Sequence, residues 1–291
     1  MKIEIQTLCA IVGLLVVTQG FSQEDKTDES NLKLYTPSKL LKKGDWDVKW
    51  FNNLYTETKK DINGDTKKVL RASFFTASLD IFTGVSENNR INIGLLLEYR
   101  SNTIGGRQAI SVFDLKNAVT ARKGLSSFAP VIKFQPLKNV VNFSIQSAFY
   151  IPIISKETDI NGVYLDQTAF AFQNKFFYDY TFSSKQWQFF AELNTAYNFG
   201  KEESFANNTF LAAPSVFVSY FPTQKFTVLG FVQHSQRFGD FTQNYTAVGL
   251  GGKCQLTNAL NLEVLYSNFV RGRDTGLGQT FNLGLRYLLT K

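Results

Sequence analysis

A strict alternation of apolar and polar residues, repeated along most of the chain, is the feature that most constrains how this sequence can fold. In the stretch WQFFAELNTAYNFG (187–200), Trp187 and Phe199 fall on one side of an extended chain, and Glu192 and Asn194 fall on the other. Successive side chains of a β-strand point to opposite faces. The stretch is therefore predicted to be a strand with one apolar and one polar face.

Twelve such segments follow one another along the chain. They are Asp47–Thr58, Val69–Val85, Ile91–Ser101, Ser126–Gln135, Val140–Ile153, Gln167–Phe182, Trp187–Phe199, Phe210–Phe221, Phe226–Arg237, Tyr245–Leu256, Leu260–Arg271 and Thr280–Leu289. Most run about ten to fourteen residues, whereas strands of soluble proteins usually have about five or six. A strand tilted across a membrane needs about nine to eleven residues. Their length therefore favours strands that cross a lipid bilayer.

The links between these segments alternate in length. Short links at 86–90, 136–139, 183–186, 222–225 and 257–259 alternate with mostly longer links at 59–68, 102–125, 154–166, 200–209, 238–244 and 272–279. Turns on one side and longer loops on the other are typical of outer-membrane barrels, whereas a soluble sandwich needs long Greek-key crossings. We therefore predict an all-β fold: a single up-and-down antiparallel transmembrane β-barrel of about 12 strands, with short periplasmic turns and longer extracellular loops.

The first residues of the chain predict export. A charged start is followed by an apolar run from Leu8 to Val17 and by small residues before Gln23, which is the pattern of a secretory signal peptide. The run is too short for a transmembrane helix, which needs about twenty residues. We expect 1–22 to be a cleaved signal peptide, 23–45 a flexible periplasmic lead-in and 46–291 the barrel. The predicted location is the cell outer membrane.

The composition leaves little material for catalysis or metal binding. Cys254 is the single cysteine after Gln23, and His234 is the single histidine of the chain. An internal disulfide and a Cys/His zinc site are therefore both excluded for the exported chain. His234 and Ser235 are neighbours on a predicted strand, so they face opposite ways and cannot form the dyad of a barrel phospholipase. We expect no enzyme activity, no catalytic residue, no cofactor and no metal, with a barrel lipid hydrolase as a less favoured alternative.

The formal net charge of +7 is dispersed along the chain. A basic balance usually suggests an acidic surface, an anionic solute or nucleic acid. Because the chain is predicted to be exported, we expect no nucleic-acid partner. The high count of 28 Phe against a single Met fits β-structure better than helices, since aromatic residues are enriched in strands.

The polar faces of the segments carry many charged and amide side chains. A Lys or Arg turned to lipid at the bilayer midplane would cost about 2–4 kcal/mol. We therefore expect the polar faces to enclose a wet lumen, and the apolar faces, which end in aromatic residues, to contact lipid. The candidate lumen-lining residues are Glu98, Lys133, Gln146, Lys175, Asp179, Glu192, Lys253, Glu263 and Arg286.

The longest link, 102–125, carries the cations Arg107, Arg122 and Lys123 and a stretch, AISVFDLKNAV, that can form a short helix. One hypothesis folds this loop into or over the mouth of the barrel, where its cations draw anionic solutes. The alternative pairs the same cations with lipopolysaccharide phosphates outside the barrel. The sequence leaves both open.

Four stretches also resemble a known group of proteins. They are FSQE, WDVKWFNNLYTET, ISVFDLKNAVTARKGLSSFAPVIKFQPL and FNLGLRYLL, and together they resemble outer-membrane β-barrel proteins of Bacteroidota of the porin or transporter type. The resemblance implies a cell-envelope barrel that the barrel assembly machinery inserts among outer-membrane lipid and lipopolysaccharide, and whose substrate is unassigned.

We therefore predict a narrow channel or porin-like transporter for a small solute of unknown identity. Twelve strands enclose much less space than the sixteen to eighteen of general porins. Long side chains of opposite sign can pair across such a bore and close it. The alternative is accordingly a non-conducting structural or interaction barrel of the outer membrane.

Overall fold

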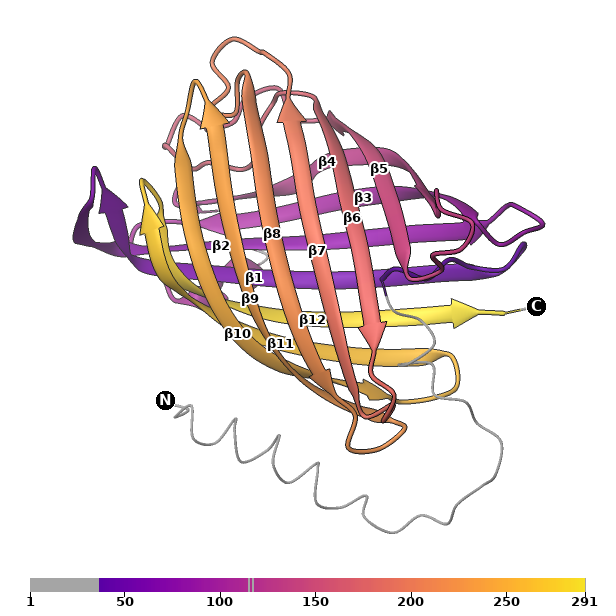
Figure 1. Ribbon diagram of the computed structural model, residues 1–291. Helices are drawn as coiled ribbons and strands as arrows, with labels where there is room; N and C mark the ends of the chain where they lie inside the picture. The colour runs from indigo at the N-terminus through magenta and orange to yellow at the C-terminus, as the bar shows by residue number, and fades with distance from the viewer. Residues whose placement is uncertain (1–36, 115, 117, 291) are drawn as a thin grey trace.

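A computed structural model describes residues 37–290 apart from residues 115 and 117. Twelve antiparallel strands form one closed barrel, in which each strand pairs with its neighbours in sequence and β1 pairs with β12 (Figure 1). The predicted all-β up-and-down barrel is thus confirmed. The strands are β1 (Trp46–Ile62), β2 (Asp65–Gly84), β3 (Ile91–Thr103), β4 (Ala121–Phe134), β5 (Phe143–Pro152), β6 (Ala171–Thr181), β7 (Trp187–Asn198), β8 (Thr209–Tyr220), β9 (Phe226–Gly239), β10 (Gln243–Gln255), β11 (Leu260–Arg273) and β12 (Gly276–Leu289).

The predicted signal peptide and most of the predicted lead-in lie outside the described residues, so these boundaries stay predictions. Within the described residues, no helix is long and apolar enough to cross a bilayer. The described part of the long link between β3 and β4 contains one 3₁₀ helix, η1 (Ala109–Phe113).

Three of the predicted longer links, 59–68, 238–244 and 272–279, are shorter than predicted, because the strands beside them continue further than the apolar pattern does. The predicted link 59–68 is a two-residue turn, since β1 and β2 pair as far as Ile62 and Asp65. Its residues, Asn63 and Gly64, have φ of 56° and 93°, as a tight type I′ hairpin turn requires. Polar residues extend these ladders, and a hydropathy pattern does not detect such an extension. Figure 1 shows the resulting hairpin projecting beyond the barrel rim.

The strand pleat separates an outward apolar face from an inward polar face. On β7, the outward Trp187 and Leu193 are 45% and 40% exposed, whereas the inward Gln188 and Asn198 are 7% and 2% exposed. A packed soluble core would give the opposite ordering, since large apolar side chains would then be the buried ones. The outward face of this barrel is therefore the apolar one.

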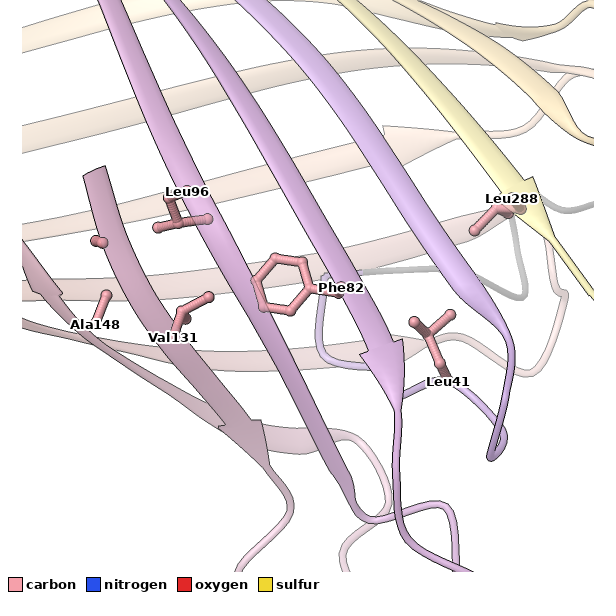
Figure 2. Close-up of a cluster of buried hydrophobic side chains, with 7 residues drawn as sticks. Leu41, Phe82, Leu96, Val131, Ala148 and Leu288 are labelled. Carbon is pink, nitrogen blue, oxygen red and sulfur yellow. The ribbon is translucent and has the colours of Figure 1, made fainter. Parts of the chain in front are cut away.

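Part of the inward face is also apolar. Phe82, Leu96 and Val131, on β2 to β4, form a buried cluster with Leu41, which comes from the chain before β1 (Figure 2). The segment 37–45 therefore enters the barrel interior before β1 begins. It enters at the end that carries the short links, which we call the turn end; the opposite end is the loop end.

A charge placed on the outward face should reveal its contact with lipid. Leu283 lies in the middle of β12 and Leu289 at its end, and both are outward and exposed. We expect Leu283→Arg to lower the free energy of unfolding in lipid vesicles by about 2–4 kcal/mol, and Leu289→Arg by only about 0–1 kcal/mol, because the cost depends on depth. Denaturant unfolding followed by tryptophan fluorescence measures both. An equal loss of unfolding free energy in the two variants would contradict the placement of Leu283 near the bilayer midplane and of Leu289 near its boundary.

Candidate functional site

The barrel interior holds the candidate site. Strand alternation places all nine predicted lumen residues on the inward face, and their role in solute passage stays a prediction. Seven of them line one cavity of about 210 Å³: Lys133, Gln146, Lys175, Glu192, Lys253, Glu263 and Arg286. Asp179 is the next inward residue on β6 after Phe177, toward the turn end, and it lies outside this set. Glu98 lies on β3, beside the loop end of the cavity.

Several of the charges around the cavity are paired across strands. The guanidinium of Arg286 donates two hydrogen bonds to the carboxylate of Asp47, at 2.8 and 2.6 Å. The ammonium of Lys253 lies 2.8 Å from Glu263, its direct cross-strand neighbour. Lys175 and Glu192 are 3.9 Å apart. Pairing offsets part of the cost of removing these charges from bulk water.

The segment 37–45, which we call the plug segment, occupies the turn end of the lumen. The ammonium of Lys133 donates hydrogen bonds to the backbone carbonyls of Pro37 and Lys39. The backbone N–H of Leu41 donates to the side-chain oxygen of Asn92 at 3.2 Å. These contacts hold the plug segment against the inward faces of β3 and β4. We had expected this segment to be part of the flexible lead-in.

Gly84 allows the plug segment to lie close to the end of β2. The backbone N–H of Gly84 donates to the carbonyl of Asp45 at 3.2 Å, and its carbonyl accepts from Gly44 at 2.9 Å. A Cβ atom at position 84 would lie 2.1 Å from the carbonyl oxygen of Lys42. A larger residue at this position therefore has to push the plug segment away from the barrel wall.

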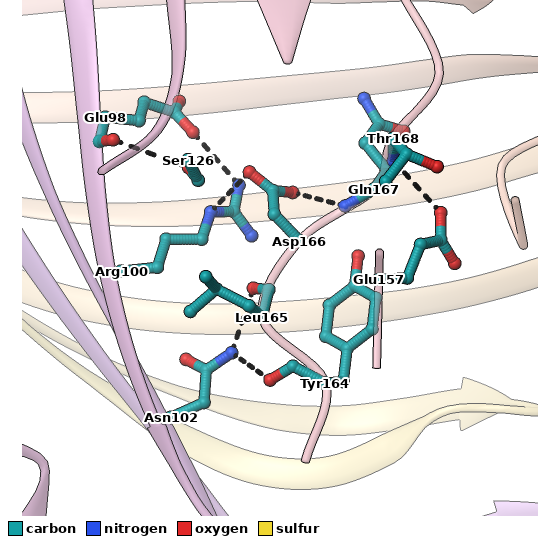
Figure 3. Close-up of polar contacts among 10 residues, drawn as sticks. All are labelled: Glu98, Arg100, Asn102, Ser126, Glu157, Tyr164, Leu165, Asp166, Gln167 and Thr168. Carbon is teal, nitrogen blue, oxygen red and sulfur yellow. Dashed lines mark hydrogen bonds and ion pairs between the residues drawn. The ribbon is translucent and has the colours of Figure 1, made fainter. Parts of the chain in front are cut away.

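The link between β5 and β6 (153–170), which we call the luminal loop, enters the interior from the loop end (Figure 3). Nε of Arg100 lies 3.0 Å from the carboxylate of Asp166. Nδ2 of Asn102 donates to the carbonyls of Tyr164 and Leu165 at 2.8 and 3.0 Å. Burial raises the pKa of the Asp166 carboxyl above its ordinary value, and the attraction of Arg100 partly offsets this rise. Inward residues of β3 thus hold the luminal loop inside the barrel.

Glu157 connects the luminal loop to the link between β7 and β8. Its carboxylate accepts hydrogen bonds from the Ser204 hydroxyl at 2.6 Å and from the backbone N–H groups of Phe205 and Thr168, both at 3.1 Å. Arg122 donates to the carbonyl of the same residue, Glu157, at 2.7 Å. One residue therefore anchors two loops at the mouth.

The long link that carries the predicted mouth cations lies elsewhere. The hydroxyl of Ser101, on the outward face of β3, donates to the carbonyl of Val112 in η1 at 2.6 Å, and Phe113 packs edge-on against outward Phe75 at 4.9 Å between ring centroids. Arg107 pairs with Asp114 at 2.6 Å within the link. The 3₁₀ helix thus rests on the outside wall.

The other two predicted mouth cations also have partners in the protein. The ammonium of Lys123 donates to the carbonyl of Asp114 at 3.1 Å, and Arg122 holds the luminal loop. The predicted start of the next strand at Gln167 is wrong, because β6 begins at Ala171, and the apolar alternation does not indicate that the link before it enters the lumen. The apolar residues Val163, Leu165 and Ala169 in this link are the sequence feature that could have indicated insertion. The structure buries all three.

The pair His234 and Ser235, considered for chemistry, is separated by the barrel wall. His234 faces outward, where its Nδ1 lies 2.9 Å from the hydroxyl of Thr246, and Ser235 faces the interior. The two side chains therefore cannot act together as base and nucleophile. In the part of the chain that the structure describes, no group of three or more His, Cys, Asp or Glu residues could hold a metal ion.

Comparison with known proteins places the fold. No family model matches the chain, and no curated protein matches it in sequence. An outer-membrane channel from Pseudomonas putida F1 is similar in structure, with a TM-score of 0.68 and 11% identity over 88% of this chain and 98% of that one. The β domain of the Bordetella autotransporter BrkA has a TM-score of 0.56 and 12% identity over 83% of this chain and 98% of that one. The chain therefore has the fold of outer-membrane β-barrels, which hosts more than one function.

Removing the Glu157 carboxylate should release the luminal loop without unfolding the barrel. We expect Glu157→Ala to speed amide exchange across residues 157–168 by about tenfold or more, while the strands keep their protection, because local openings are governed by local contacts. Hydrogen exchange with mass spectrometry measures this. Glu202→Ala is the matched control, since Glu202 is an exposed acid in the link that Glu157 contacts. Unchanged exchange in Glu157→Ala would show that the other contacts of the loop suffice.

Proposed function

We propose that this chain is a narrow outer-membrane channel for small solutes. The observation that carries the proposal is a closed barrel with an apolar outward face, around a cavity that is lined by charged side chains. A charged, hydratable interior suits the passage of a polar solute and serves no purpose in a merely packed core. The cavity is small, so the solute has to be small as well.

The two inserted segments define the ends of this passage. The plug segment reaches Lys133 from the turn end, and the luminal loop reaches Arg100 from the loop end. Loops and terminal segments that fold into a barrel commonly narrow or close it. We therefore propose that at least the plug segment moves when a solute passes.

The cellular setting belongs to the same proposal. An apolar outer face and the predicted signal peptide support export to the outer membrane, insertion by the barrel assembly machinery, and contact with outer-membrane lipid and lipopolysaccharide. Membership among the barrels of Bacteroidota rests on the sequence resemblance alone.

A non-conducting structural barrel is the second candidate. It is supported by the insertion of a segment at each end of the lumen. The ion pairs Arg286–Asp47 and Lys253–Glu263 join neighbouring strands along the wall and leave the bore unbridged. A lipid hydrolase has less support, because the outward His234 and the inward Ser235 are separated by the barrel wall.

Single-channel recording in planar bilayers tests the channel directly. We expect the purified barrel to give small conductance steps, and we expect Gly84→Ala to increase the conductance or the open fraction. The physical reason is that the added Cβ would lie 2.1 Å from the Lys42 carbonyl oxygen and would displace the plug segment.

The matched control is Gly230→Ala, whose Cβ would meet its nearest atom at 3.9 Å, an ordinary contact. Its conductance should equal that of the unmodified protein. A folded barrel that stays silent both unmodified and as Gly84→Ala would favour the non-conducting candidate and defeat the channel.

A further inference from the structure

The central cavity carries more positive than negative charge. Its cationic lining residues are Lys39, Lys49, Lys133, Lys175, Lys253 and Arg286. Its anionic lining residues are Asp47, Asp80, Glu192 and Glu263. Three ion pairs neutralise three residues of each sign. Three lysines therefore face one remaining carboxylate, Asp80, so the cavity has a surplus of cations.

None of these three lysines has a carboxylate partner within 4 Å among the described residues. The ammonium of Lys133 donates instead to the carbonyls of Pro37 and Lys39, and it lies 5.3 Å from the ring centroid of Phe177. Lys49 lies over the ring of Phe51, at 5.2 Å. The two carbonyl oxygens on Lys133 resemble the two oxygens of a carboxylate, which would bind this ammonium more strongly than neutral carbonyls do.

An independent observation indicates a missing partner on the cavity wall. The hydroxyl of Thr227 and the side-chain oxygen of Asn261 are buried, and neither has a hydrogen-bond partner within the described part of the chain. Thr227 is only 2% exposed, and both residues line the cavity. Buried polar atoms are nearly always satisfied by protein, water or a ligand. The hydroxyl of Thr227, which lies directly across the strand from Lys253, can donate a hydrogen bond to an anion.

Aromatic side chains complete the wall. Phe82, Phe177 and Phe221 line the same cavity as the lysines. Phe177 also begins a row of inward rings that continues through Phe190 and Phe217, with centroid separations of 6.1 and 5.5 Å. These rings offer an apolar surface to the part of a ligand that carries no charge.

We infer that the central cavity binds a small organic anion with an apolar body, of the class of arylacetates and short aliphatic carboxylates. Its carboxylate takes the hydrogen bonds of Lys49, Lys133 and the Thr227 hydroxyl, and its body lies against Phe177 and Phe221. The volume of about 210 Å³ is below the range for drug-sized ligands, which limits the ligand to a small one. This inference rests on the proposed function, because a solute has to enter through one end of the barrel.

Equilibrium dialysis of radiolabelled phenylacetate against the purified barrel in zwitterionic detergent tests the inference, with empty micelles as the blank. We expect saturable binding to the unmodified protein or, where the plug segment closes the cavity, to Gly84→Ala. Lys49→Gln and Lys133→Gln should each weaken binding by about tenfold or more, because hydrogen bonds to a charged group are lost. Heat-modifiable gel mobility shows that each variant has folded. If only one of Lys49→Gln and Lys133→Gln folds, that variant alone is compared with the unmodified protein.

Phenethylamine, with the same ring and the opposite charge, should not bind. Lys225→Gln, which removes an exposed lysine from a turn outside the cavity, should bind phenylacetate as the unmodified protein does. Equal binding of phenethylamine, equal loss in Lys225→Gln, or no binding to either the unmodified barrel or Gly84→Ala would overturn the inference. Binding without conductance contradicts the channel alone, and conductance without binding contradicts the anion site alone.

Discussion

Pairing of β1 with β12 is the interaction on which the rest of the structure depends. A lipid bilayer offers no hydrogen-bond partner to the backbone, so a β-sheet can cross it only when no edge strand remains. The ladder from Trp46↔Leu289 to Glu57↔Gly278 satisfies both edges along almost their whole length. Gly278 lies close to its partner strand, since a Cβ there would be 2.2 Å from the carbonyl oxygen of Thr56. Closure of the barrel therefore depends on backbone contact as well as on the apolar outer face.

Closure also determines where the charges lie. Once the apolar face meets lipid, the alternating polar face must enclose the interior, and a twelve-stranded interior brings opposite walls near each other. The ion pair between Arg286 and Asp47 joins the two strands that close the barrel, and Lys253 pairs with Glu263 two ladders away. The charges left over after this pairing, among them Lys49 and Lys133, are the ones available to a solute.

The barrel wall could be predicted from sequence, whereas the contents of the lumen could not. A period of two identifies strands such as β7 because each residue there is placed by its immediate neighbours. The plug segment and the luminal loop are placed by contacts between distant residues, such as Leu41 with Asn92 and Arg100 with Asp166. Leu41 stands in a charged stretch with no usable apolar face, so local pattern gave it no role. Most of the charged side chains that line the cavity follow from strand alternation, whereas the plug residues that close its turn end, Pro37, Lys39 and Leu41, do not.

The two inserted segments are both held by contacts that involve charged side chains. Ordering one residue costs about 1–2 kcal/mol of backbone entropy, and a neutral hydrogen bond returns about 0.5–1.5 kcal/mol. The plug segment has one buried apolar side chain, Leu41, and it is held by the ammonium of Lys133, by an ion pair of Lys43 with Glu87 and by backbone hydrogen bonds. The luminal loop adds the ion pair of Arg100 with Asp166 and three bonds to the Glu157 carboxylate. Charge-assisted bonds are about twice as strong as neutral ones. Under the proposed function, a solute that competes with the plug segment for Lys133 favours its departure from the lumen, because both bind the same ammonium.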